Sequence, residues 1–104
     1  FINTHEMIQE SQTKSTARDV LEAKLSPSVA WGAVDYYGNS QYPFGFKLKI
    51  ASGMLAETAE DENTWFLKAE CEVKNSYGTW VAGVCEARVS GTTKSPQIDY
   101  FMVY

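Results

Sequence analysis

Two alternating stretches in the middle of the chain predict a β-hairpin. From Trp65 to Val73 every second residue is apolar, and the residues between them are mostly charged. From Val81 to Val89 a period of two returns, which is typical of strands with one buried face. The sequence Asn75-Ser76-Tyr77-Gly78 between them is rich in turn-forming residues. We therefore expect an antiparallel hairpin over residues 65–90.

Two further strands are expected on either side of this hairpin. Apolar residues alternate with lysines from Phe46 to Ile50, and Gly53 is expected to mark a bulge or the end of that strand. Residues 97–104 form the last predicted strand. Residues 57–64 are polar and acidic and are expected to form a loop.

One helix is predicted before the strands. Apolar residues recur at helical spacing between Thr16 and Leu25, and Asp19 lies in the first turn, where the helix dipole favours an acid. The helix is expected over about Thr16–Leu25, with an extension back to Thr4 left open, and it ends before Pro27. Residues 28–45 contain several turn formers, which are expected to interrupt any long element.

Together these elements predict an α+β fold, in which one N-terminal helix packs on a four-stranded antiparallel meander sheet. The chain has 104 residues, the size of one domain. We expect residues 1–104 to form a single domain, with residues 1–15 as a helical extension or a linker.

The cysteines, Cys71 and Cys85, both lie on the predicted apolar face of the hairpin. A three-residue loop with Gly78 in the left-handed conformation would pair Ala69 with Cys85. The thiols would then be diagonal neighbours, about 7–8 Å apart and too distant for an easy disulfide. A turn shifted by one residue would place the cysteines opposite each other, so both a disulfide and two buried thiols stay open.

Charge and hydropathy argue against two classes of partner. The net charge is −4 and the nine basic residues are scattered, so nucleic acid is not expected as a partner. No apolar stretch is long enough to cross a bilayer. The chain starts at Phe1 rather than Met, and we expect membrane attachment only through an anchor upstream of it.

No constellation of residues predicts catalysis, a metal site or a cofactor. His5-Glu6 opens like a zinc-protease motif, but His5 is the one histidine and Gln9 occupies the second ligand position. Thiols on an apolar strand face are poor nucleophiles. Glu57, Glu60, Asp61 and Glu62 are expected to be solvated in a loop rather than paired in a cleft.

Aromatic residues gather before the first predicted strand. The group consists of Tyr36, Tyr37, Tyr42, Phe44 and Phe46. Aromatic side chains on loops favour recognition of peptides, sugars or protein surfaces, although these could instead cover a sheet edge. Trp80 points outward by alternation and either packs under this loop or extends an exposed patch. The candidate binding residues are therefore Tyr36, Tyr37, Tyr42, Phe44 and Trp80.

Residues 17–31, in which a charged helix runs into Ser26-Pro27-Ser28 and then an aromatic, are similar to a segment of small, mostly uncharacterised bacterial and phage domains. Asn75-Ser76-Tyr77-Gly78 followed by Cys85 resembles their hairpin turn with a cysteine on the returning strand. The resemblance covers residues 17–31 and 65–89, with no Thr after Ser28 and a shorter gap before Cys85. It implies an extracytoplasmic domain behind a membrane or lipoprotein anchor, and it transfers no catalytic residues.

A shorter stretch, Val81-Ala82-Gly83-Val84 after Thr79-Trp80, resembles the inhibitory loop of cystatins, which also place a helix on a four-stranded sheet. The glutamine of that loop is missing here, and the stretch is expected inside a strand rather than at a hairpin tip. The sequence thus favours a non-enzymatic binding or accessory domain that acts through protein contacts outside the cytoplasm. The alternative is a cystatin-like or other protein inhibitor of an enzyme.

Overall fold

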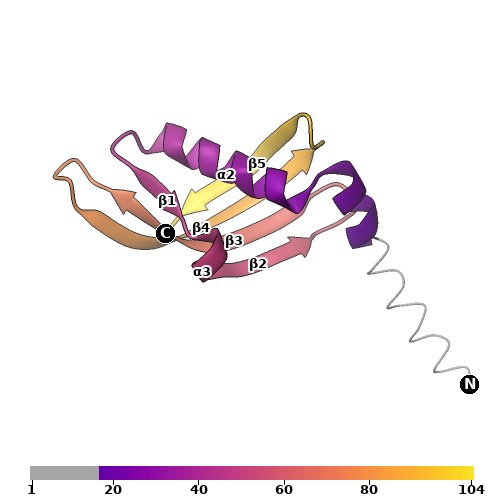
Figure 1. Ribbon diagram of the computed structural model, residues 1–104, viewed down its shortest axis with the longest axis horizontal. Coiled ribbons are helices and arrows are strands. Elements are labelled where there is room, and N and C mark those ends of the chain that lie inside the picture. The colour runs from indigo at the N-terminus through magenta and orange to yellow at the C-terminus, as the bar shows by residue number, and fades with distance from the viewer. Residues whose placement is uncertain (1–16) are drawn as a thin grey trace, which may run out of the picture.

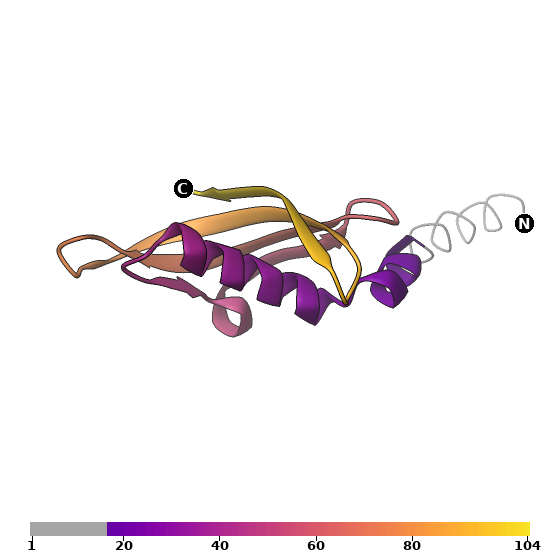
Figure 2. The ribbon, with the colours of Figure 1, turned by 90° about the horizontal axis from the view of Figure 1, so that it is seen from above.

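A curved antiparallel sheet carries the helices on one of its faces (Figures 1 and 2). The structure, a computed structural model, describes residues 17–104. Residues 17–24 are helical. The elements that follow are α2 (Pro27–Gln41), β1 (Phe46–Leu48), α3 (Ile50–Gly53), β2 (Met54–Ala59), β3 (Trp65–Lys74), β4 (Trp80–Gly91) and β5 (Pro96–Val103).

The sheet is built around β3, which is paired on both sides. β4 pairs antiparallel with all of β3, and β5 pairs antiparallel with β4. The other edge of β3 is shared, because β1 pairs with residues 71–73 and β2 with residues 65–69. The short helix α3 separates β1 from β2, and the backbone N–H of Lys49 before it still donates to the carbonyl of Glu70.

The β3–β4 turn sets the register of the hairpin. The side chain of Asn75 accepts hydrogen bonds from the backbone N–H groups of Tyr77 and Thr79, and Gly78 has a φ of +83°. This three-residue loop pairs Ala69 with Cys85 and Cys71 with Gly83. The register predicted from a left-handed Gly78 is therefore confirmed.

The core lies between the inner face of the sheet and the helices. Alternate residues of the hairpin face inward, as the period of two predicts, and those from Trp65 to Cys71 and from Cys85 to Val89 are almost fully buried. The buried apolar residues are Leu21, Leu25, Ala30, Trp31, Val34, Phe46, Trp65, Leu67, Ala69, Cys71, Cys85, Ala87 and Val89. All of these residues except Phe46 come from the helical region 21–34 and from the strands β3 and β4.

The two helical segments are separated by a break at Ser26, and a buried tryptophan donates a hydrogen bond to the backbone at this break. Proline lacks a backbone N–H and disfavours helical geometry in the residue before it, so Pro27 ends the first helix and begins α2. The carbonyl of Leu25 is left without a helical partner. The indole Nε1–H of Trp65, a fully buried residue, donates to that carbonyl at 2.8 Å.

The α+β class and the antiparallel sheet are confirmed, but the predicted count of one helix and four strands is wrong. Residues 28–45 were expected to lack a long element, yet Pro27–Gln41 is helical. Packing overrides the weak helix propensity of its glycines, since α2 buries a stripe against the sheet. Residues 57–59, expected in a loop, extend β2. The extension of the first helix back to Thr4, which the sequence left open, falls outside the described residues.

Replacing the indole of Trp65 tests whether its hydrogen bond to the Leu25 carbonyl stabilises the break between the two helical segments. The Trp65→Phe variant leaves the Leu25 carbonyl buried without a donor and opens a cavity, so we expect a loss of about 2–4 kcal/mol in the free energy of unfolding. The measurement is urea unfolding followed by circular dichroism. The half-buried Trp80 supplies a matched control, and Trp80→Phe should cost less than about 1 kcal/mol. Equal losses in the two variants would contradict this role.

Two glycines of α2 make a second matched pair. A Cβ at Gly38 would press into the ring of Phe46, whereas a Cβ at Gly32 would meet nothing within 4 Å. Gly32→Ala should therefore stabilise the protein by about 0.5–1 kcal/mol through helix propensity, and Gly38→Ala should destabilise it by at least about 1 kcal/mol. Thermal unfolding of both variants measures the difference, and a gain in both would show that Phe46 moves aside freely.

Candidate functional site

The aromatic residues predicted as a binding patch are spread over several surfaces. Tyr36 on α2 is 81% exposed and Phe44 after it is 60% exposed. Tyr37 instead packs edge-on against Phe101, with ring centroids 4.9 Å apart. Tyr42 stacks on the buried ring of Phe46 at 5.9 Å. The five candidates therefore do not form one surface.

Trp80 lies on the outer face of the sheet, opposite the helices. A Cβ at Gly45 would meet its ring, so Trp80 packs against the loop before β1. Lys47 and Lys74 both place their ammonium groups near this ring, at 4.3 and 5.6 Å from its centroid. Trp80 is half-buried as a result, and it forms a cationic aromatic cluster with the two lysines.

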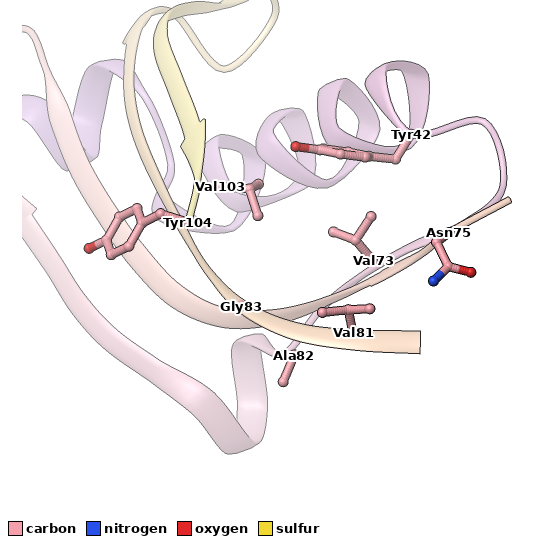
Figure 3. A pocket seen from close by; sticks show the side chains of 8 residues that line it. All are labelled: Tyr42, Val73, Asn75, Val81, Ala82, Gly83, Val103 and Tyr104. Atoms are coloured by element: carbon pink, nitrogen blue, oxygen red, sulfur yellow. The ribbon is translucent and has the colours of Figure 1, made fainter. Parts of the chain in front are cut away.

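Tyr42 lines an open groove of about 290 Å³ beside the start of β4. We call it the β4 groove; its lining residues are Tyr42, Val73, Asn75, Val81, Ala82, Gly83, Val103 and Tyr104. Figure 3 shows Val81 pointing toward Val73 and Val103, with Tyr42 on the far side of them. The lining is predominantly apolar, and Val81 is 52% exposed. The groove is thus an accessible apolar surface.

Beside the β4 groove, β5 is paired with β4 as far as Val84. The last backbone hydrogen bonds between β4 and the end of β5 are those that Val84 and Tyr104 exchange, at 2.8 and 2.9 Å. β4 begins four residues earlier, at Trp80, and its residues 80–83 pair with β3 alone among the described strands. On the inward face of the sheet, these residues therefore have no neighbour in β5.

Both thiols are sealed in the core. Cys71 and Cys85 are free and are 1% and 2% exposed, and the register makes them diagonal neighbours rather than a directly opposed pair. Burial raises the pKa of Cys71, and burial followed by the charges of Cys71 and Glu86 raises the pKa of Cys85 to about 12. Such thiols stay protonated at neutral pH and are poor nucleophiles.

Asp61 and Glu62 are exposed in a loop as expected, whereas Glu57 lies on β2, and Glu57 and Glu60 each bind an arginine side chain. Glu57 accepts hydrogen bonds at 3.0 Å from Arg18 on one carboxylate oxygen and from the indole of Trp31 on the other. Glu60 pairs with Arg88 at 2.6 Å. Among residues 17–104, no group of three or more acidic, histidine or cysteine side chains could hold a metal ion.

The stretch that resembles the cystatin loop lies within a strand. Val81 and Gly83 pair with Val73 and Cys71 of β3, and the hairpin tip is formed by residues 75–79. A cystatin-like inhibitory loop would have to project as a tip. The geometry of this stretch therefore does not support that mode of inhibition.

Comparison of the chain with protein-family models, with curated proteins and with solved structures returned no match. Among residues 17–104, no helix has both the length and the apolar content needed to cross a membrane.

The buried thiols make stability depend on alkaline pH. Their folded pKa values lie above the unfolded value of about 8.5, so the unfolded chain loses these protons first as the pH rises. We expect the free energy of unfolding to be highest below about pH 8.5 and to fall between there and about pH 12, where Cys85 titrates in the folded protein. Urea unfolding across this range provides the measurement.

The matched variant carries both Cys71→Ala and Cys85→Ala. All other ionisable side chains are the same in both proteins, so the difference between the two slopes reports the thiols alone. The double variant should lose stability less steeply with pH. Parallel slopes would mean that the thiols ionise equally well in the folded state.

Proposed function

We propose that this chain is a non-enzymatic binding or accessory domain that contacts other proteins through the β4 groove. The observation that carries the proposal is the accessible apolar lining of that groove at one end of the sheet. Apolar side chains such as Val81 are costly to leave in water, and grooves of this kind commonly bind apolar side chains of a partner. Val103 and Tyr42 supply the walls.

The groove also has the rigid frame that binding requires. Its floor is formed by β3 and β4, which are paired along their whole shared length, and Tyr42 is held by stacking on Phe46. A preformed surface loses little conformational entropy when a partner binds. The lining offers no charged side chain, which favours binding over acid–base chemistry.

Action outside the cytoplasm remains part of the proposal. Its support is the resemblance of residues 17–31 and 65–89 to small extracytoplasmic domains. Burial of Cys71 and Cys85 fits such a compartment, because buried protonated thiols are protected from oxidation. Attachment to a membrane would require an anchor upstream of Phe1.

Selection from a phage-displayed library of random peptides on the immobilised 104-residue chain tests the proposal. We expect enriched sequences rich in aliphatic and aromatic residues, and synthetic labelled peptides should bind with measurable fluorescence anisotropy. The Val81→Asp variant places a charge in the groove and should weaken that binding at least about tenfold.

Leu55→Asp provides the matched control. Leu55 lies on β2 and is 53% exposed, against 52% for Val81, and it does not line the groove. This variant should bind the peptides as the parent protein does. The proposal fails if no sequence is enriched, or if both variants bind as tightly as the parent.

A further inference from the structure

The side of β2 that faces away from β3 is an edge of the sheet. No other strand among residues 17–104 pairs with it there. The backbone N–H of Glu60 donates to the carbonyl of Thr64, toward β3. Because these groups alternate in direction along a strand, Glu57 and Ala59 direct their N–H and C=O groups away from β3. Groups of this kind can pair with a strand of another molecule.

The side chain of Arg18 occupies this edge. Its guanidinium, on the helical segment 17–24, donates at 3.1 Å to the backbone carbonyl of Glu57. Figure 1 shows that segment beside the end of β2. A strand paired at the edge would need the same carbonyl, so it could form its hydrogen bonds there only by displacing Arg18.

Several contacts fix the position of Arg18. The guanidinium also donates to the carboxylates of Glu57 and Glu22, at 3.0 and 2.7 Å, and it lies 5.0 Å from the ring centroid of Trp65. Arg18 thus binds the carboxylate and the backbone carbonyl of Glu57 together. The planar fork of a guanidinium allows this geometry, whereas an ammonium group binds as a point charge.

Two other features of β2 act in the same direction. The carboxylate of Glu57 lies on the inner face of the sheet, because Glu57 pairs with the buried Leu67 and accepts a hydrogen bond from the indole of Trp31 on α2. β2 also has a bulge between Met54 and Ala56. Inward charges, bulges and a covering helix are devices by which proteins keep edge strands from pairing. β2 has all three.

We infer that Arg18 blocks the outer edge of β2 and keeps it from pairing with the same edge of a second copy of this chain. Without the guanidinium, the carbonyl of Glu57 and the backbone groups of Ala59 are free for an antiparallel partner, and a second copy of β2 is present in every solution of the protein. Met54 and Leu55 are 44% and 53% exposed beside this edge, and they add apolar surface to such a pair.

Removal of the guanidinium tests the inference. We expect Arg18→Ala to associate, with a mean mass at the highest concentration at least about twice that of the parent protein, measured by sedimentation velocity over about a hundredfold range of concentration.

Arg88→Ala is the matched control. Arg88 is 39% exposed against 42% for Arg18, also binds a glutamate and also lies over aromatic rings, but among residues 17–104 it donates to no backbone carbonyl. This variant should sediment as the parent does. Equal association of Arg18→Ala and Arg88→Ala, or of neither, would overturn the inference.

A proline separates edge pairing from aggregation of unfolded chains. Ala59→Pro removes an N–H that faces away from β3 and keeps the bonds to that strand, and proline is tolerated on an edge. The double variant Arg18→Ala/Ala59→Pro should return to the mass of the parent. Association that persists in it would show that the copies meet elsewhere.

A milder pair of variants decides the question if circular dichroism shows that Arg18→Ala is unfolded. Arg18→Lys and Arg88→Lys each keep the charge, but a lysine at position 18 loses the forked contact with Glu57. Arg18→Lys should associate and Arg88→Lys should not. Equal masses of the two lysine variants would contradict the inference.

Amide hydrogen exchange locates the contact. In Arg18→Ala, exchange at Glu57 and Ala59 should slow as the protein concentration rises, because the amides become paired. Protection confined to other strands would place the contact elsewhere. Slow exchange at both amides in the dilute parent would mean that the chain already pairs this edge itself. Either result would overturn the role of Arg18.

Discussion

The hydrogen bond from Trp65 to the Leu25 carbonyl is the contact on which the arrangement of helices and sheet depends. Pro27 forces the chain out of one helix and into the next, and a buried break of this kind leaves polar backbone groups that must find partners. Trp65 satisfies one of them from the centre of the sheet, and the guanidinium of Arg18 lies 5.0 Å from its ring. Arg18 also binds Glu57, which holds the indole of Trp31. Both helical segments are thereby tied to β2 and β3.

The β4 groove lies at the other end of the sheet from the helix break. At the helix break, β3 is flanked by β2 and β4 and its inward side chains are almost completely buried. Toward the hairpin tip, β5 no longer accompanies β4, and the same inward alternation that builds the core opens into a groove. The lining residues of the groove thus continue the inward alternation that builds the core.

Local sequence signals predicted the parts of the fold that local chemistry determines. The alternation of the hairpin predicted both strands and the inward position of the two cysteines, and the structure has one of the two registers that the turn residues left open. α2 was missed because Gly32 and Gly38 lower its helix propensity, and contacts with the sheet compensate for that loss. The β4 groove was missed except for Tyr42, because it depends on where β5 stops relative to β4. The role of Glu57 likewise depends on Arg18 and Trp31, which are distant in sequence.

The close approach of Gly38 to Phe46 has a consequence for the order of folding events. A helix that contains two glycines is unstable alone, so α2 requires the sheet as a template. We therefore expect the β3–β4 hairpin to be structured in the folding transition state and α2 to dock afterwards. Core substitutions in α2, such as Val34→Ala, would then mainly accelerate unfolding, and those in the hairpin, such as Leu67→Ala, would slow folding. A slower folding rate for the α2 variant alone would reverse this order.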